Sequence, residues 1–529
     1  MRQNRGSRNP GALSAVMKTA VAVVTTVLAV ALAACSDDST EAASPGQVNR
    51  DAVLRYATPT PNALFDPAQT TSPTADFATM SPIYEGLLTY DKDGESITLV
   101  PGLAESFEVS PDGLEITFKL RTGVTFQDGT PFDSAAVAAN IERGKTLSKS
   151  TIAGNFEVIT SVETPDPTTA VFKLAEPSSA LLHDLAAVPG FMVSPAAFDA
   201  DPAKSPVGTG PYKLASATAT VNTYERFPDY WNPDNKGFVK TIELHVVTDD
   251  NAAINGFQSG QFDIVRIQPT TLSKAKSLAQ SGDGKLLELA SQAQRMLYVN
   301  GTNPLLGDPR VREALDLALD RGSLNEGAFG GTCAASDQIF TPSVQGHVPS
   351  GLEPGFDPTR AKQLLAEAGA TNLSITLLSP TVSDVTAATQ IIQAAWSDIG
   401  VQTKIVPFDP VQARGEYRAG KYDAFLASLP GSPDPASILG QFLTRDTLSP
   451  LPADLEQKTR AASELSLSDP GREGAYQEVS KIIHDNRVGG IPLCVLADAA
   501  LSAPNVDNPD SARARLTRQT ALAEVKIFG

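Results

Sequence analysis

The chain has 529 residues, enough for two or three domains of ordinary size, and 41% of them are hydrophobic. Its formal net charge is −18, and an acidic surface of this kind repels nucleic acid and anionic lipid. Composition therefore argues against nucleic-acid binding and against membrane attachment through a basic patch.

Residues 1–34 are predicted to be a secretory signal peptide. Arg2, Arg5, Arg8 and Lys18 precede an uncharged stretch that consists mostly of Ala, Val and Leu. A basic start followed by a short apolar segment is the layout of a secretory signal. The apolar segment is short for a membrane-spanning helix, which needs about 20 residues.

The signal ends in Leu32-Ala33-Ala34-Cys35, which resembles the lipobox of bacterial lipoproteins. In that family the cysteine sulfur is lipidated and the chain is cut just before it, so Cys35 would be the first mature residue. The alternative is an uncleaved N-terminal anchor with an incidental cysteine. Either interpretation places the body of the protein outside the cytoplasm. In the lipoprotein interpretation, 35–47 form a lipidated tether that is too polar to pack.

The first clear secondary structure is a β-hairpin followed by a helix. Residues 114–120, "LEITFKL", alternate apolar and polar side chains, which predicts a half-buried strand. A Pro-Asp-Gly turn at 111–113 precedes it, and 107–109 would supply the pairing strand. Asp133 is placed to cap a helix that runs through about Glu142.

Helices and strands alternate in the second half of the chain, which predicts an α/β unit. Asp308 would cap a helix that begins at Pro309 and ends at Gly322, and Asp357 would cap another that ends at Gly369. Two further helices are predicted, one from about 251 with a break at Gly260 and one at 387–399. Further strands are predicted at 262–265, 373–379 and 401–408.

The sequence carries no recognisable catalytic or metal-binding motif. The four histidines are too far apart along the chain for one helix face to present two of them to a metal. HExxH, GxSxG and Walker motifs are absent. We therefore expect a binding protein without a metal, a cofactor or a catalytic residue.

Two cysteines, Cys333 and Cys494, remain if Cys35 is lipidated. An even pair in an oxidising compartment suggests a disulfide, and two separate buried thiols are the alternative. A nucleophilic role for Cys333 beside a distant histidine is a third, weaker interpretation.

The block "GLAESFEVSPDGLEITFKLRTGVTFQDGTPFDSAAVAANIER", residues 102–143, resembles the signature of the family 5 extracellular solute-binding proteins. These are the peptide- and nickel-binding receptors of bacterial ABC importers. Further blocks of the family follow in its order: "SPVGTGPYKL" (205–214), "ERFPDYWNP" (225–233), "GFQSGQFDIV" (256–265), "DPRVREALDLALDR" (308–321), "FDPTRAKQLLAEAG" (356–369), "PDP" (433–435) and "IPL" (491–493). The resemblance covers nearly the whole mature chain.

The resemblance implies an α/β, two-lobed periplasmic-binding-protein-like fold with an extra subdomain in the first lobe and a hinge that closes on ligand. Its glycines at 208 and 210 are expected to mark a crossing between domains, where glycine permits backbone angles that other residues resist. By analogy the first lobe comprises 48–88, 206–290 and 506–529, the extra subdomain 89–205, and the second lobe 291–505.

The ligand site implied by the resemblance includes the loop "LASLPGSPDPASIL", residues 426–439. Peptide receptors of the family hold a peptide ammonium with an aspartate in this loop, and Gly431 stands at that position here. Asp434 remains, as an acid that caps or turns the loop itself. A buried ammonium without a carboxylate is costly, which argues against ordinary peptides with a free N-terminus. The candidate ligand-binding residues are Phe65, Arg295, Ser428, Leu429, Gly431 and Ser432; Arg295 would pair with an anionic ligand group or form a surface salt bridge.

We therefore expect a monomeric, lipid-anchored receptor on the outer face of the bacterial cell membrane or in the periplasm. It would capture a peptide or peptide-like solute for membrane permeases of an ABC importer. The alternatives are a receptor for a non-peptide solute (a glycoside, an opine-like compound or a metal complex), a secreted lipoprotein hydrolase, and a sensor or adhesion protein that kept the fold.

Overall fold

The computed structural model describes residues 46–59, 64–70, 73–93, 96–268, 271–352, 355–410, 412–467, 469–511, 514 and 520–529. The predicted signal peptide, Cys35 and all but the last two residues of the predicted tether lie outside these ranges. Within them, no helix has the length and apolar character that a membrane crossing requires.

A four-stranded antiparallel sheet contains the predicted hairpin. Its strand order is β4-β5-β7-β6. The predicted strand at 114–120 is confirmed as β5, in which Ile116 and Phe118 are buried, whereas Leu114 lies before the strand and is exposed. Helix α2 packs against this sheet, and Asp133 caps it by accepting a hydrogen bond from the backbone N–H of Ala136. The bounds are β4 Ala104–Val109, β5 Glu115–Leu120, β6 Ile159–Asp166, β7 Thr169–Leu174 and α2 Ser134–Thr146.

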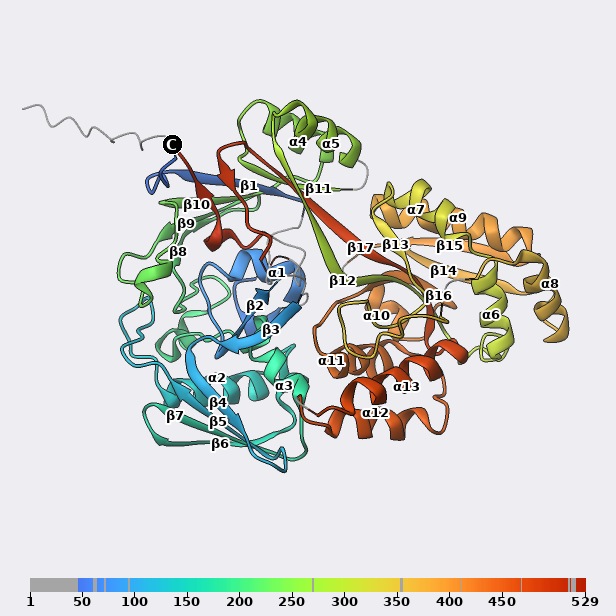
Figure 1. Cartoon of the computed structure of the whole chain (residues 1–529), viewed down its shortest axis with the longest axis horizontal. Coiled ribbons are helices and arrows are strands. Elements are labelled where there is room, and N and C mark those ends of the chain that lie inside the picture. The colour runs from blue at the N-terminus through green and yellow to red at the C-terminus, as the bar shows by residue number, and fades with distance from the viewer. Residues whose placement is uncertain are drawn as a thin grey trace, which may run out of the picture. The chain divides into compact units, whose positions relative to one another are not determined.

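A large mixed sheet runs through the rest of the described chain, in the order β15-β14-β16-β12-β17-β11-β1-β10-β9-β8 (Figure 1). Strands β1, β10 and β11 pair in parallel, as do β14, β15 and β16. The bounds are β1 Val53–Thr58, β8 Tyr212–Ala217, β9 Val221–Arg226, β10 Thr241–Val246, β11 Ile264–Ile267, β12 Lys285–Val299, β14 Ser374–Pro380, β15 Gln402–Phe408, β16 Ala424–Leu429 and β17 Gly490–Ser502.

Two long antiparallel strands, β12 and β17, join the two groups of strands within this sheet (Figure 1). Their pairing extends from Lys285 opposite Ser502 to Tyr298 opposite Gly490. The register shifts twice, between Ala290 and Gln294 and again after Arg295. Such irregularities bend a strand pair and interrupt its ladder of hydrogen bonds.

Helices cover both faces of the β15-β14-β16-β12 group because successive side chains of a strand point to opposite faces. Leu426 of β16 faces the cluster formed with α6, α7, α8 and α9, whereas Phe425 faces the cluster formed with α10, α11, η7, α12 and α13. The bounds are α6 Pro309–Leu317, α7 Arg321–Phe329, α8 Pro358–Glu367, α9 Ser383–Asp398, α10 Ala413–Arg418, α11 Pro435–Leu439, η7 Gly440–Asp446 (a π-helix), α12 Leu455–Glu464 and α13 Arg472–Asp485.

The strands β8 to β11 and β1 have two clusters of their own. Leu54 and Tyr56 of β1 pack in one, and Ala57 packs in the other, beneath α4 and α5. The remaining main elements are α1 Pro73–Met80, β2 Leu88–Asp93, β3 Ser96–Pro101, α3 Ser179–Asp184, α4 Asp250–Gln258, α5 Leu272–Ser281 and β13 Cys333–Ala335. The lobe boundaries proposed from the sequence stay a prediction.

One predicted helix is shorter than expected. The helix that begins after Asp308 ends at Leu317 and does not reach Gly322. Asp320 accepts hydrogen bonds from the backbone N–H groups of Gly322 and Ser323, and this cap starts a new helix, α7. The cap at Asp320 therefore decides where the new helix starts, even though the apolar stripe continues. Its side chain accepts hydrogen bonds from backbone N–H groups in the first turn of that helix.

The reason expected for the glycines at 208 and 210 is wrong. Neither has the positive φ that would favour glycine. A Cβ at Gly208 would lie 2.2 Å from the carbonyl oxygen of Ile83, and one at Gly210 would lie 2.6 Å from that of Pro82. Glycine is therefore needed here because two backbone segments approach closely. A third segment also contacts this site, since Gln127 Nε2 donates to the carbonyl of Gly210 at 2.9 Å.

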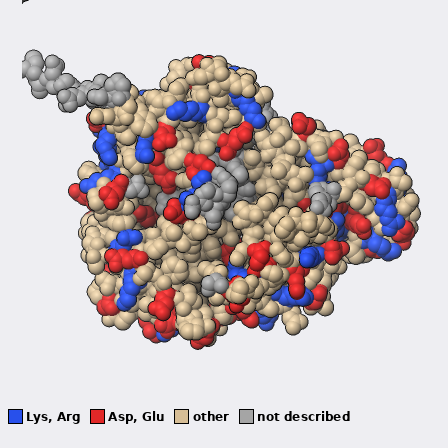
Figure 2. Space-filling view, in the orientation of Figure 1, with Lys and Arg blue, Asp and Glu red and all other residues tan. Residues whose placement is uncertain are grey.

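Acidic and basic side chains are interspersed on the described part of the face drawn in Figure 2, and no continuous basic patch forms there.

Candidate ligand-binding site

The loop predicted to bind ligand begins where β16 ends. Leu429, its last strand residue, is buried in the cluster beneath α11. Ser432 accepts a hydrogen bond from the backbone N–H of Asp434 at 3.1 Å, and Asp434 then caps α11, whose first residue is Pro435. The predicted capping role of Asp434 is confirmed. Ser428, Gly431 and Ser432 are half-buried.

The structure brings Arg295 and Ser428 together. Arg295 on β12 lies opposite Ser428 on β16 and donates from Nη1 to its hydroxyl oxygen at 3.2 Å. Its Nη2 forms an ion pair with Asp384 in the first turn of α9. The guanidinium also lies over the ring of Phe329, 5.6 Å from its centroid. Arg295 therefore makes a buried ion pair, in place of the surface salt bridge considered from the sequence.

A second arginine, Arg414 of α10, holds the same strand end from the other face of the sheet. Its Nη2 donates to the backbone carbonyl of Ser428 at 2.5 Å, and its Nη1 pairs with Asp446. Arg418 also pairs with Asp446, at 2.7 Å. Sequence reasoning missed Arg414, because its partners are 14 and 32 residues away and no local pattern points to them.

Both carboxylate oxygens of Asp434 are occupied by other parts of the protein. Oδ1 accepts from Ser179 at 3.1 Å and from Arg472 Nη2 at 2.6 Å, and Oδ2 accepts from the backbone N–H and the hydroxyl of Ser437 at 3.0 and 3.1 Å. The side chains of Asp434 and Arg472 are 0% and 1% exposed. Asp434 is thus committed to protein partners.

Phe65 lies apart from these residues. Its side chain is 5% exposed and packs in the cluster around Leu54 and Tyr56. The neighbouring Asp66 forms a double hydrogen bond with Arg143 of α2, at 2.9 and 2.6 Å. Phe65 therefore packs in a different cluster from Leu429 of the 426–439 loop. Its role as a ligand-binding residue stays a prediction, as do those of Arg295, Ser428, Leu429, Gly431 and Ser432.

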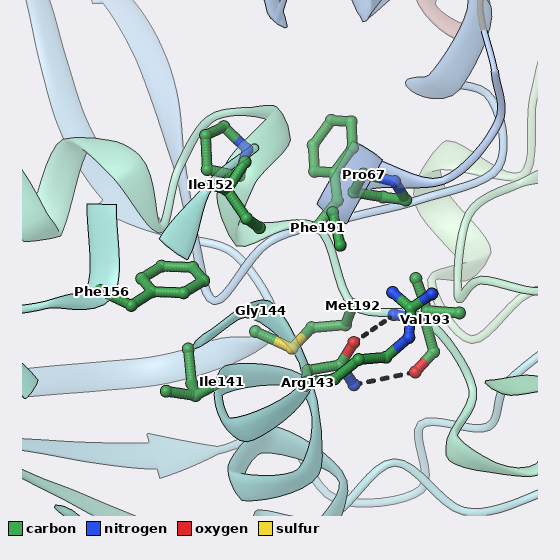
Figure 3. A pocket seen from close by; sticks show the side chains of 12 residues that line it. Pro67, Ile141, Arg143, Gly144, Ile152, Phe156, Phe191, Met192 and Val193 are labelled. Carbon is green, nitrogen blue, oxygen red and sulfur yellow. Dashed lines mark hydrogen bonds between the residues drawn. The ribbon is translucent and has the colours of Figure 1, made fainter. Parts of the chain in front are cut away.

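A small cavity lies beside Arg143 (Figure 3), with Phe191 and Met192 among its lining residues. Asn140 fastens its wall through two hydrogen bonds with the backbone of Val193, at 2.8 and 2.9 Å. The cavity has room for about one water molecule, so it is not a solute site.

Three titratable groups on α3 and β2, namely His183, Asp184 and Tyr90, interact electrostatically with Asp434. Burial raises the pKa of Asp184 to about 7; its hydrogen bond with Asn155 and the charge of Arg445 act in the opposite direction, and the charge of Asp434 adds to the rise. Burial lowers the pKa of His183, so this imidazole is held neutral.

Cys333 and Cys494 form a disulfide that joins β13 to β17. Cys494 lies directly opposite Arg295 on β12, so the disulfide, the buried ion pair and the start of the loop share one part of the sheet. No group of three His, Cys, Asp or Glu side chains suited to a metal ion occurs among the described residues.

Comparison with known proteins gives a consistent family and fold. The family model described as bacterial extracellular solute-binding proteins, family 5 (middle), matches residues 98–449. The glutathione-binding protein GsiB of Escherichia coli (strain K12) is 34% identical over 346 residues, and so is that of Shigella dysenteriae serotype 1. The match covers 63% of this chain and 65% of those relatives, just under two thirds of their length.

Solved structures of low sequence identity share the fold over most of the chain. DppA from Helicobacter pylori, in complex with the peptide STSA, gives a TM-score of 0.80 at 21% identity and covers 91% of this chain and 99% of its own. AgaA from A. tumefaciens R10, in complex with agropinic acid, gives 0.78 at 24% identity, with 90% and 99% covered. NikA from Brucella suis, in complex with Fe(III)-EDTA, gives 0.76 at 23% identity, with 89% and 99% covered. The predicted periplasmic-binding-protein fold is confirmed.

Proposed function

Because the chain belongs to the bacterial extracellular solute-binding proteins of family 5, we propose that it is a non-enzymatic, substrate-binding receptor of an ABC importer. It captures a peptide or peptide-like solute in a cleft between two lobes, and hinge motion closes the lobes. The observation that carries this proposal is the family match over residues 98–449. The matched range includes the four-stranded sheet, β12 and β16. The interrupted ladder of hydrogen bonds between β12 and β17 supports this proposal, because a bent strand pair can serve as the hinge.

The same proposal includes an anchor and a partner. Lipid on Cys35 holds the receptor at the outer face of the membrane, and the closed, loaded form presents its solute to the permeases. Support for the anchor comes from the lipobox-like residues 32–35 and the polar tether after them. The lobe division given by the family resemblance is part of this proposal.

A specific observation favours a non-peptide solute as the second candidate. Asp434 is the one carboxylate of the 426–439 loop, and its oxygens are occupied by Ser179, Arg472 and Ser437. Gly431 supplies no carboxylate, so this loop offers nothing that would neutralise a ligand ammonium. Known structures with this fold include complexes with a peptide, with agropinic acid and with Fe(III)-EDTA, so the fold suits both ligand classes.

Isothermal titration calorimetry on the full-length chain tests the proposal. The probes are a tripeptide, its N-acetylated form, glutathione, agropinic acid and Fe(III)-EDTA. We expect saturable 1:1 binding of at least one probe, without chemical conversion, and no loss of peptide binding on acetylation. Turnover of a probe would contradict the receptor and favour a hydrolase.

A variant pair tests the loop directly. Gly431→Asp restores a carboxylate at the loop, and we expect it to increase the preference for a free amine over the acetylated peptide. Ala366→Asp is the matched control, because it adds the same charge at an exposed position of α8. An equal effect of both variants would show that the loop does not face the solute.

A further inference from the structure

One hydroxyl group joins two parts of the fold that pack in different clusters. Ser179 is the first residue of α3, whose Leu181 and Leu182 pack with the four-stranded sheet. Its hydroxyl reaches Asp434 at the start of α11 and Arg472 at the start of α13. Those two helices pack in the separate cluster beneath β16.

The hydroxyl lies beside a direct ion pair and forms a hydrogen bond with each of its two members. Ser179 donates to Asp434 Oδ1 at 3.1 Å and accepts from Arg472 Nη2 at 3.0 Å, while Arg472 Nη2 donates to the same Oδ1 at 2.6 Å. A buried ion pair is stable only when further hydrogen bonds satisfy its remaining donors and acceptors. Ser179 supplies one to each partner, and it does so from outside their own cluster.

Within its own cluster the ion pair has further partners, although Arg472 Nε is buried without one. Ser437 donates to Asp434 Oδ2, Gln345 accepts from Arg472 Nη1, and the guanidinium lies over the ring of Tyr476, 4.9 Å from its centroid. The pair is therefore pre-organised on the predicted second lobe, and Ser179 is the contact that comes from the predicted extra subdomain.

A second contact between the same parts lies nearby. Arg445 of η7 approaches Gly154, where an added Cβ would be 3.4 Å from its Nη2. The same guanidinium acts on the carboxylate of Asp184, at the end of α3. Two cations of one part, Arg445 and Arg472, thus face α3 and the 3-10 helix Ala153–Phe156 that follows α2.

We propose that Ser179 is a latch residue, which bridges the Asp434–Arg472 ion pair when the lobes are closed and so stabilises the closed form. This inference rests on the proposed function, because it assigns a closing contact to that receptor. Opening would carry α3 away from α11 and α13, and water would take the place of the hydroxyl. The contact then favours only the closed state, and a contact of that kind shifts the equilibrium between the two states.

Hydrogen exchange of backbone amides in the full-length chain, without added solute, tests the latch. Ser179→Ala is expected to speed exchange about tenfold in both α3 and α11, because a lost hydrogen bond to charged groups shifts opening by about that factor. Exchange in β5 and β14, inside the two parts, is expected to stay unchanged. Ser179→Thr keeps the hydroxyl and is expected to restore slow exchange.

Ser437→Ala is the matched control. It removes a hydroxyl that donates a hydrogen bond to the same carboxylate. Ser437, however, lies on α11, the helix that Asp434 caps, so its hydrogen bond does not connect α11 with α3. We expect α3 to exchange as slowly in this variant as in the natural chain. Equal exchange of α3 and α11 in the natural chain and in Ser179→Ala would overturn the latch, as would an effect of Ser437→Ala on α3 equal to that of Ser179→Ala. Solute binding is not measured here, so either result leaves the receptor proposal to its own calorimetric test.

Discussion

Ser428 shows how single residues fix the start of the candidate site. Arg295 binds its hydroxyl from one face of the sheet, and Arg414 binds its carbonyl from the other. Each arginine is in turn paired with a buried aspartate, Asp384 or Asp446. The two arginines thereby hold the end of β16 in place before the chain enters the loop. Asp434 holds the far end of the loop by capping α11.

The role of Arg295 can be decided by a double-mutant cycle. Arg295→Met leaves the Asp384 carboxylate buried without its cation, so we expect unfolding in urea to show a loss of about 3 kcal/mol. Asp384→Leu combined with Arg295→Met is expected to be less destabilising than the two single changes added together. Full stability of Arg295→Met together with lost solute binding would instead identify Arg295 as a ligand anchor.

Gly208 should not tolerate a methyl group. The Cβ of Gly208→Ala would lie 2.2 Å from the Ile83 carbonyl oxygen, so the two backbone segments must separate. We expect a loss of roughly 2–4 kcal/mol in the free energy of unfolding, measured by chemical denaturation. Gly415→Ala is the control: it lies in α10 with no atom within 4 Å of the added Cβ, and it should be neutral or slightly stabilising. Equal effects of the two changes would contradict the close approach.

At the scale of elements, α3 gives the protein a pH dependence through Asp184. Burial raises its pKa in the folded protein to about 7, against an ordinary value of 3.8, despite Asn155 and Arg445. Between about pH 4 and pH 7, the folded state therefore still holds a proton on Asp184 that the unfolded chain has already released. Asp184 thus makes stability fall as pH rises through that window and leaves it constant above pH 7.

Asp184→Asn should remove this contribution. His183, Tyr90, Asp434, Arg445 and Arg472 surround the site and remain in the variant, so the difference between the two proteins isolates Asp184. From pH 5 to pH 7 we expect the natural chain to lose stability relative to the variant, by at most about 1.4 kcal/mol per pH unit. Urea midpoints at pH 5, 6, 7 and 8 measure it, and parallel curves would refute the assignment.

The disulfide between β13 and β17 is a second element-scale constraint. It joins cysteines 161 residues apart in the sequence, and a crosslink over a long loop restricts the unfolded chain strongly. Replacing Cys333 and Cys494 together by serine is expected to lower the free energy of unfolding by about 2–4 kcal/mol. Reductant should destabilise the natural chain and leave the double variant unchanged; an unchanged midpoint in the double variant would show that the bond contributes nothing.

Local signals in the sequence predicted many elements well. Asp133, Asp308 and Asp357 all cap helices as expected, because a cap is set by a few neighbouring residues. The end of the helix after Asp308 was missed, since a second cap at Asp320 competes with a continuing apolar stripe. Gly208 and Gly210 were recognised as special, but their close neighbours, Ile83 and Pro82, are more than 120 residues earlier and no local pattern names them.

At the scale of the whole molecule, the family resemblance predicted the fold, and the comparisons confirm it. The site was predicted less completely. The 426–439 loop and the capping role of Asp434 followed from the family resemblance, which places an acid directly before a proline here, whereas Arg472 and Ser179 did not. Arg472 lies 38 residues from Asp434, and Ser179 lies 255 residues from it, so their convergence depends on the tertiary fold alone.

The central claim is that the protein carries a solute and does not convert one. Native mass spectrometry of the full-length chain, purified from its own host, tests this most directly. We predict one small molecule per chain, released unchanged on unfolding, with a mass that distinguishes a peptide from a non-peptide solute. A protein that carries nothing from its host, gains no mass with any class of probe and chemically converts one of them would contradict the account.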